Sequence, residues 1–587
     1  MLSVTRRAAI PAMTYRPVHR AVRLSFRLWG LLCFAIAASI THANELTIQT
    51  PFGIGADAHT GRNIKDYQRW IPAMSRIGVT VYRCGGPGWG DVEKKPGQWT
   101  WSDCDANMDY LDSQHITYGG ILMGIPPWKK TKWGLPMEDL PAWSDYVSHV
   151  VAHCKGRIKY WEVWNEPPNF IAKGQTAADY AAIVRTAYDA AHAADPNCLV
   201  GLAAKSVHVN WLEQTILAGA KDHFDYITLH PYETLGAVTE DVGYEPVFLN
   251  IVPTVRKMLA AQDPARANVP IIFTEIGSDA GKDPDKPAAA LVKAYAMAIA
   301  QGVTCVDWFE GMDGDSGPMG LLKADGTPRP ACTAYAQILQ HLGAHPAYLG
   351  WLLLHGKDYG FVFQGAKSTV LIAWAGPGPS EPLDLRQAAS ITNPLTGATN
   401  PAGAVTLTAD PVIVERVPSD LLQQAVAHQG EPLPWGGDYT HAGSISITFG
   451  ATTVENGLHT MAGRDIAADV IAYGGNARSG DVPGGNAFMV DPGFLTYTPT
   501  PIEIRIVVRR NAANDKAGFH LVYESTHGFK SLGWYTVPDN QSWHTVSYKV
   551  DDEQFVGMWA FNFLLNSDGH TFDKYEIRSV TVTKLTP

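Results

Sequence analysis

Two glutamates in this chain stand where short apolar runs meet polar loops. Glu166 lies in "YWEVWNEPPNF", residues 160–170, and Glu275 ends "VPIIFTE", residues 269–275. Two carboxyl groups on either side of a glycosidic bond are the minimum machinery for its hydrolysis, because one protonates the departing oxygen and the other attacks or activates water. Two unrelated loop glutamates are the alternative, and position alone does not separate these interpretations.

Eight apolar or β-branched runs predict the strands that would hold these residues. They are residues 52–56, 79–84, 117–124, 158–165, 199–204, 224–230, 269–275 and 303–309. Helical patterns separate them, most clearly Ala177 to Ala194 with Thr176 as N-cap and Asp179 at the third position. A doubly wound sheet is the competing α/β arrangement, but the first run leads into "ADAHTG", which offers no glycine-rich phosphate loop. We therefore expect a (β/α)8 TIM barrel over residues 44–345.

Beyond the barrel the pattern changes to strands alone, with turn-rich segments between them. We expect an accessory β-sandwich over residues 346–418, a linker over 419–440, and a jelly-roll-like C-terminal β-sandwich over 441–587. The last domain has the general character of a carbohydrate-binding module, and a spacer role is equally open. Its tryptophans, with that of the linker, are Trp435, Trp534, Trp543 and Trp559.

The first 43 residues contain six arginines and no acid, followed by the apolar run Leu28 to Ile40 and then "THA". This layout is typical of a secretory signal peptide over residues 1–43. An uncleaved anchor is the alternative, but a 13-residue run is shorter than the roughly 20 residues that span a bilayer. We expect a secreted or periplasmic protein that has no membrane contact after signal removal.

Charge and cysteine content exclude some classes of partner. Loss of the six arginines changes the formal net charge from −11 to −17, which disfavours a nucleic-acid partner. Six cysteines remain, which permits disulfides without assigning them, and Cys84 and Cys104 are the pair nearest in sequence. Because no CxxC spacing occurs and two carboxylates need no metal for hydrolysis, we expect no metal or other cofactor.

In a barrel of this kind the reacting groups lie at the carboxyl ends of the strands. Several side chains of the sequence therefore join the two glutamates as candidate site residues. They are Arg83, Asn165, His230, Tyr232, Trp308 and Glu310, with Trp128 on a loop near the expected mouth. For Trp128 and its neighbours Trp89, Trp133 and Trp164, stacking on a sugar and packing in the core both stay open. Glu310 is either a substrate contact or a hydrated loop acid.

Several motifs resemble those of retaining glycoside hydrolases with (β/α)8 barrels. They are "VYRCGGPGWGDVEKKPGQWTWSDCD", "WEVWNEP", "FDYITLHPY", "TEIG" and "GLLKADGTPRPACTAY". The pattern most resembles glycoside hydrolase family 39, with family 5 as a near neighbour. The resemblance covers residues 50–345, extends to about 418, and does not reach the C-terminal domain.

The resemblance implies roles for individual residues. Glu166 would be the acid/base, and Glu275 would be the nucleophile. Asn165 would hold the sugar 2-hydroxyl, and Trp308 would form the floor under the sugar. Tyr232 would bond the nucleophile, Arg83 would steady its charge, and His230 belongs to the same "HPY" motif.

Retaining enzymes of this kind place their two carboxyl groups about 5 to 5.5 Å apart. At that spacing we expect ionised Glu275 to raise the pKa of Glu166 and so keep it protonated as a general acid. Glu162, four residues before Glu166 and deeper in the strand, is expected to be a structural carboxylate paired with a cation such as Arg83.

Together these features predict an exported retaining glycosidase that cleaves β-linked polysaccharides by double displacement. Endo action is favoured, because the strand-to-loop connections look short and an additional β-domain suits a polymer. An exo-acting β-xylosidase or β-glycosidase on oligosaccharides is the first alternative, and a catalytically silent carbohydrate-binding protein is the second. The expected partner is a polysaccharide or oligosaccharide substrate, and the oligomeric state stays open.

Overall fold

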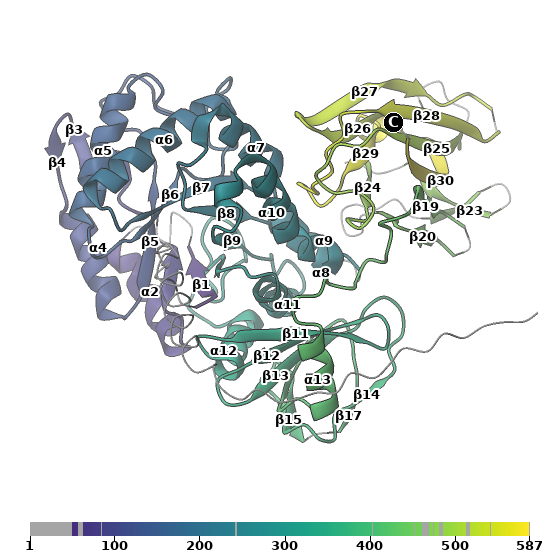
Figure 1. Cartoon of the computed structure of the whole chain (residues 1–587), viewed down its shortest axis with the longest axis horizontal. Coiled ribbons are helices and arrows are strands. Elements are labelled where there is room, and N and C mark those ends of the chain that lie inside the picture. The colour runs from purple at the N-terminus through teal and green to yellow at the C-terminus, as the bar shows by residue number, and fades with distance from the viewer. Residues whose placement is uncertain are drawn as a thin grey trace, which may run out of the picture. The chain divides into compact units, whose positions relative to one another are not determined.

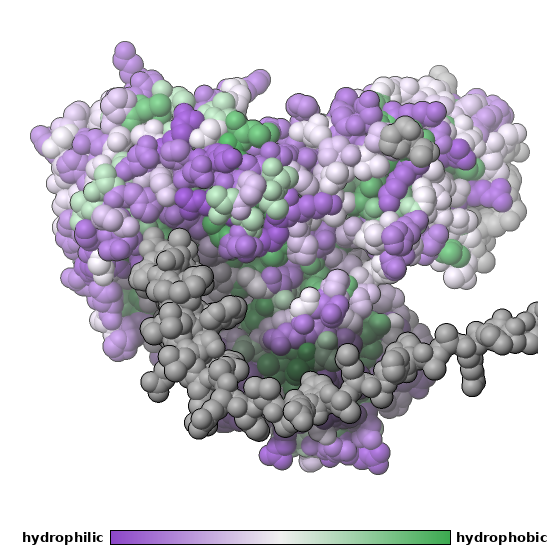
Figure 2. All heavy atoms as spheres, in the orientation of Figure 1, coloured by the Kyte–Doolittle hydropathy of each residue, from purple (hydrophilic) through white to green (hydrophobic). Residues whose placement is uncertain are grey.

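The computed structural model describes residues 48, 50–56, 61, 63–83, 85–240, 243–401, 403–450, 452–460, 469–472, 475–480, 485–511, 517–540 and 542–585. They fall in one compact unit, Leu46–Pro587. The expected signal peptide and Cys84 lie outside the described residues. None of the described helices is both long and apolar enough to cross a membrane. The face drawn in Figure 2 is mostly hydrophilic, with scattered hydrophobic residues.

Eight parallel strands close into a barrel in the order β1-β10-β9-β8-β7-β6-β5-β2, which confirms the predicted fold. The strands are β1 (Phe52–Gly55), β2 (Val81–Arg83), β5 (Thr117–Leu122), β6 (Tyr160–Val163), β7 (Leu199–Lys205), β8 (Tyr226–His230), β9 (Ile271–Ile276) and β10 (Cys305–Trp308). Every predicted strand is present; seven are one to four residues shorter than predicted, and β7 is one residue longer. Figure 1 shows the barrel strands with helices around them.

Helices follow the strands as the (β/α)8 pattern requires. The longer ones are α2 (Ile64–Arg76), α4 (Ser102–Ser113), α5 (Leu140–His153), α6 (Ala177–Ala194), α7 (Val209–Thr215), α8 (Tyr232–Glu240), α10 (Ile251–Gln262), α11 (Lys286–Ala300) and α12 (Pro330–Leu342). Short elements are α3 (Trp89–Val92), α9 (Glu245–Leu249), η2 (Ile216–Ala220), η3 (Pro264–Arg266) and the hairpin of β3 (Glu93–Lys95) and β4 (Gln98–Trp99).

Helix α6 shows how the sequence positions the strand that carries Glu166. It has the predicted bounds and a capping box between Thr176 and Asp179. Its buried Tyr180 donates a hydrogen bond to the carbonyl of Val163 (2.7 Å) and accepts one from the backbone of Ala203 (2.9 Å). One side chain therefore fixes the ends of two neighbouring strands, β6 and β7.

Tyrosine rings fill part of the barrel interior. Tyr160 and Tyr226 are buried, and a Cβ added at Gly119 or Gly201 would lie 2.5 Å from an atom of one of these rings. Glycine at these two positions therefore lets the rings fit between the strands. The same interior cluster includes Ile272.

After the barrel, residues 347–415 form antiparallel sheets with orders β11-β12-β13-β18-β15-β16 and β14-β17. The strands are β11 (Ala347–Leu354), β12 (Asp358–Gln364), β13 (Thr369–Trp374), β14 (Pro382–Asp384), β15 (Ser390–Thr392), β16 (Thr399–Pro401), β17 (Ala404–Thr406) and β18 (Val412–Glu415). Residues 404–417 contain two strands, β17 and β18, in different sheets. Helix α13 (Ser419–Ala427) lies in the expected linker.

The C-terminal region has two antiparallel sheets around a separate apolar core. One contains β19 (Ser444–Thr448), β20 (Val454–Asn456), β22 (Asp469–Ala472), β23 (Gly475–Ser479), β25 (Ile502–Arg510), β28 (His544–Val550) and β30 (Tyr575–Lys584). The other contains β21 (Leu458–Thr460), β24 (Asn486–Val490), β26 (Gly518–Ser525), β27 (Gly528–Thr536) and β29 (Phe563–Asn566), and a short helix η4 (Gly569–Thr571) precedes β30. The core is therefore enclosed between two β-sheets.

Candidate active site

Glu275, at the carboxyl end of β9, is held by two neighbours. The Nη1 of Arg83 forms an ion pair and hydrogen bond with Oε1 of Glu275. The Tyr232 hydroxyl donates to Oε2 at 3.0 Å. The Glu275 side chain is 14% exposed, so part of it remains open to a substrate. A cation on one oxygen and a donor on the other fix the orientation of this carboxylate.

Arg83 connects Glu275 to the interior of the barrel. Its Nε donates to Oε2 of Glu162 at 2.9 Å, so the predicted pairing of Glu162 with Arg83 is present. Its Nη2 donates to the Oδ1 of Asn165 at 2.8 Å. Burial would lower the pKa of Arg83, but the carboxylates of Glu162 and Glu275 outweigh it and raise the pKa. The guanidinium is therefore a permanent charge that orients three side chains.

The backbone around Glu166 is strained. Trp164 and Glu166 have φ values of +67° and +45°, in the left-handed region that residues with a Cβ seldom adopt. The indole of Trp164 donates to the carbonyl of Phe170 at 2.6 Å, and the backbone N–H of Asn169 donates to the carbonyl of Glu166 at 2.6 Å. These bonds hold a tight turn that presents the Glu166 side chain, which is 18% exposed. Strain of this kind clusters at functional sites.

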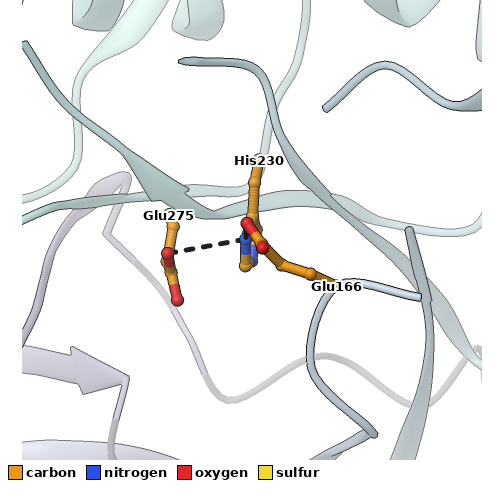
Figure 3. A group of neighbouring side chains, drawn as sticks. All are labelled: Glu166, His230 and Glu275. Carbon is orange, nitrogen blue, oxygen red and sulfur yellow. Dashed lines mark hydrogen bonds and ion pairs between the residues drawn. The ribbon is translucent and has the colours of Figure 1, made fainter. Parts of the chain in front are cut away.

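His230, at the end of β8, lies between the two carboxylates (Figure 3). Its Nδ1 is 2.8 Å from Oε1 of Glu166 and 3.5 Å from Oε2 of Glu275. Its Nε2 is 3.0 Å from the Thr274 hydroxyl, which itself donates to Glu162 at 3.5 Å. Because the Thr274 hydroxyl gives its hydrogen to Glu162, its oxygen accepts from Nε2 of His230. Both ring nitrogens of His230 therefore face hydrogen-bond acceptors. The surroundings therefore favour imidazolium.

The pKa directions agree with that geometry and correct one expectation. Burial would lower the pKa of His230, but Glu275 and Glu166 outweigh it and raise the pKa. Burial would raise the pKa of Glu166, but the hydrogen bond and charge of His230 outweigh it and lower the pKa. The expectation that Glu275 raises the pKa of Glu166 is therefore wrong for this structure. The positive charge of His230, between the two glutamates, lowers the pKa of Glu166 instead.

The spacing of the three groups limits what they can do. One ligand atom from each of Glu166, His230 and Glu275 lies within 4.8 Å of the others. The set could surround a cation, but the Arg83 guanidinium already supplies a positive charge to Glu275. Two partly exposed carboxylates at this separation can act together on one bond.

Three further candidate residues are partly or fully buried: Trp308, Glu310 and Trp128. Trp308 is fully buried, and its Nε1 has no hydrogen-bond partner within the described ranges. Glu310 is also fully buried and accepts from the backbone N–H of Gly314 at 3.2 Å, so its interpretation as a hydrated loop acid is wrong. Trp128 is half-buried and donates to the carbonyl of Glu93 at 2.9 Å, with the Lys129 ammonium 4.8 Å from its ring. None of these contacts reaches Glu166 or Glu275.

Sequence reasoning missed two polar neighbours of Glu166. The side-chain N–H of Asn169 donates to Oε2 of Glu166 at 3.4 Å. Lys205, the last residue of β7, donates from Nζ to Oδ1 of Asn169 at 2.7 Å. Asn169 stands three residues after Glu166 in a turn, and that spacing was the one available signal. The position of Lys205 follows only from the pairing of β6 with β7.

Comparisons with known proteins agree with this barrel. Residues 132–310 match the family model for glycosyl hydrolases family 39. A family 39 glycoside hydrolase from the gut symbiont Bacteroides cellulosilyticus WH2 is 17% identical over 63% of this chain and 82% of its own, with a TM-score of 0.52. A family 39 β-xylosidase from Caulobacter crescentus is 18% identical over 64% of this chain and 97% of its own, with a TM-score of 0.47. Among curated proteins, none matches the sequence.

The barrel fold and the match of residues 132–310 to this family model indicate the class of the protein, a glycoside hydrolase with a (β/α)8 barrel. Its barrel is similar to those of family 39. The residues matched by the family model include Glu166, His230 and Glu275, three side chains of the site described above.

Proposed function

We propose that the chain is an exported retaining glycosidase that cleaves β-linked polysaccharides by double displacement. The observation that carries this proposal is the short distance between the two carboxylates, with oxygens of Glu166 and Glu275 within 4.8 Å. Retaining enzymes place these groups about 5 to 5.5 Å apart, whereas inverting enzymes leave about 6.5 to 9.5 Å for a water molecule. The observed spacing supports direct attack by a carboxylate.

Glu275 is assigned as the nucleophile because Arg83 and Tyr232 hold its two oxygens in a fixed orientation. In the first step a Glu275 oxygen forms a bond to the anomeric carbon while the bond from that carbon to the departing oxygen breaks. Glu166 gives its proton to that oxygen. Asn165, fixed by Arg83, is placed to bond a sugar hydroxyl as charge develops on the ring.

The proton for this step is assigned to the pair of His230 and Glu166. In the free site the pKa directions place it on His230, 2.8 Å from Glu166. A sugar that fills the mouth removes water from the pair, and burial favours neutral imidazole with a neutral carboxylic acid over an ion pair. The proton then moves to Glu166 and from there to the departing oxygen.

The second step reverses the chemistry. Formation of the ester removes the negative charge of Glu275, and Glu166, now ionised, takes a proton from water. The oxygen of that water attacks the anomeric carbon, and the bond to Glu275 breaks. The product therefore has the starting anomeric configuration, and no redox partner is needed.

Endo action and export remain part of the proposal and rest on sequence features. For endo action the support is the further β-sheets that follow the barrel, since the connections after β5 (residues 123–139) and β10 (residues 309–329) are not short as expected. Residues 1–43 have the composition of a secretory signal.

Product chromatography tests the proposal. The mature protein and its Glu275→Gln variant are incubated with β-glucans, xylans, mannans and bacterial exopolysaccharides. Intermediate oligosaccharides from one polymer, absent with the variant, are expected. Release of monosaccharide alone would replace endo action with exo action. If no polymer yields products but polymer binding is retained, the proposal is overturned in favour of a binding protein.

A further inference from the structure

Two aromatic side chains are exposed on the loops that follow β5 and β6. Trp133 is 57% exposed and Phe170 is 37% exposed. Their ring centroids lie 6.1 Å apart in an edge-to-face arrangement. No other large hydrophobic side chain exposed in the described ranges lies on a loop that directly follows a barrel strand. Exposed aromatic surface at one place in a hydrophilic loop region indicates a contact with something outside the chain.

The two loops are joined so that this pair is held in place. The Gln175 side chain accepts from the backbone N–H groups of Leu135 (2.7 Å) and Ala172 (2.8 Å), and donates to the carbonyl of Leu135 (2.8 Å). A Cβ at Gly134 would lie 2.5 Å from the backbone nitrogen of Ala172, so glycine permits the close approach. The aromatic pair is thus part of a preorganised surface.

The same loop connects the pair to the acid/base residue. Phe170 is four residues after Glu166, and its carbonyl accepts from the indole of buried Trp164. Asn169, the neighbour of Phe170, contacts both the backbone and the side chain of Glu166. Because the acid gives its proton to the departing oxygen, the sugar attached to that oxygen lies on the side of the Glu166 loop.

We propose that Trp133 and Phe170 form a stacking site for a sugar ring of the departing part of the substrate. The occupant is a β-linked sugar that presents its apolar C–H face to the rings while its hydroxyls reach water or polar groups. This inference rests on the proposed function, and it narrows the substrate class to glycans whose departing group is itself a sugar chain.

The test compares two substrates that differ only in the departing group. One is the polysaccharide that the wild-type protein cleaves fastest in the panel above, and the other is the β-glycosyl fluoride of its sugar or disaccharide. Trp133→Ala, Phe170→Ala and the double variant are measured beside Trp133→Phe, which keeps a stacking ring. Leu217→Ala, which shortens a side chain that is 67% exposed elsewhere on the barrel, is the matched control.

The double variant is expected to lose roughly tenfold or more in kcat/KM on the polysaccharide, mainly through KM. Its rate on the glycosyl fluoride should stay within about twofold of the wild type, because no sugar occupies the site in that substrate. Trp133→Phe should recover most of the loss, and Leu217→Ala should match the wild type. Thermal unfolding should change little, since Trp133 is 57% exposed and Phe170 is 37% exposed.

Three outcomes would overturn the inference. They are unchanged polysaccharide kinetics in the double variant, an equal loss on both substrates, or a changed oligomeric state by light scattering with unchanged kinetics. A wild-type protein that cleaves neither substrate would count against the proposed function instead. Affinity electrophoresis in gels containing each polysaccharide then decides the inference: weaker retention of the double variant than of Leu217→Ala supports the stacking site, and equal retention removes it.

Discussion

Glu275 in the barrel and Glu524 in the C-terminal β-sheets are both enclosed carboxylates, but their partners differ in kind. Glu524 accepts from the backbone N–H groups of Val556 (2.9 Å), Gly557 (3.0 Å) and Met558 (2.7 Å), and from the Asn562 side chain (2.7 Å). Glu275 instead has the Arg83 guanidinium on one oxygen and the Tyr232 hydroxyl on the other.

This difference teaches how to separate a structural carboxylate from a reactive one. Burial raises the pKa of Glu524 to about 7, because the four donors only partly offset desolvation. Both oxygens of Glu524 accept hydrogen bonds from the backbone of residues 556–558, and these bonds hold that loop in place. Glu275 is paired with the charge of Arg83 and has an exposed fraction of 14%, so one side remains free to react. If depth of burial alone identified a reactive carboxylate, Glu524 would have been chosen over Glu275.

The largest expected effect comes from Glu275→Gln. An amide cannot attack the anomeric carbon, so turnover should fall by at least about 10⁴-fold while polysaccharide binding is retained. Steady-state kinetics and affinity electrophoresis measure the two properties. Glu138→Gln, at an exposed loop glutamate, is the matched control and should stay within about twofold. A fully active Glu275→Gln would remove the assigned nucleophile.

Glu166→Ala should have the next largest effect, and its size should depend on the departing group. Loss of a general acid costs about 10² to 10⁴-fold on a polysaccharide. An aryl glycoside with an acidic phenol needs little proton transfer, so it should lose much less in the glycosylation step. Kinetics on both substrates measure the contrast. The same loss on both would contradict the acid role.

His230→Gln should move the alkaline limb of the pH profile. The wild-type pair keeps its proton until pH passes the pKa of His230, which lies above its ordinary value of 6.5. Without the imidazolium, Glu166 must hold the proton alone, and the ordinary pKa of a glutamate, 4.5, lies below that of a histidine, 6.5. We expect kcat/KM to decline at lower pH than in the wild type, with a loss of about 10 to 100-fold at neutral pH. If the alkaline limb stays at the same pH in the variant, His230 does not hold the proton that Glu166 delivers.

The smallest effect on activity is expected for Glu524→Gln, which should change stability instead. The pKa of Glu524 rises from 4.5 to about 7 on folding, so the folded state keeps a proton that the unfolded state loses. The free energy of unfolding should therefore fall as pH rises through this window and level off above it. The variant should lack that slope and lose about 1 to 3 kcal/mol, because an amide nitrogen cannot accept from backbone N–H groups.

Denaturant unfolding at several pH values measures this, with kcat on a soluble substrate as the second readout. Activity of the folded variant should remain within about twofold of the wild type. A large loss of kcat with unchanged stability would remove the distinction between the two kinds of carboxylate.

The barrel could be predicted from sequence because its strands are buried on both faces and read as apolar runs. Helix α6 was equally clear, since Thr176 and Asp179 form a capping box with a purely local pattern. The short strands β14 to β16 have three residues each, too few for any periodicity to be recognised. Strand β27 has no fully buried position, so no alternation of apolar and polar residues marks it.

The site could be predicted only in part. The strand ends identify the residues that meet at the mouth, but not their mutual distances. The pKa of Glu166 was predicted with the wrong sign because His230, 64 positions away, inserts between the glutamates. Likewise Glu310 was expected to face water or substrate, but the loop around Gly314 buries it. Long-range packing decides these features, and no local pattern contains it.

The most direct test of the two-carboxylate mechanism is the configuration of the first product. Proton NMR during hydrolysis of a β-linked substrate, started with enough protein to outpace mutarotation, gives the anomer as it is released. Attack by Glu275 followed by attack of water predicts that the β-anomer appears first and the α-anomer follows slowly. Initial release of the α-anomer would show a single inversion and would contradict the assignment of Glu275 as a nucleophile.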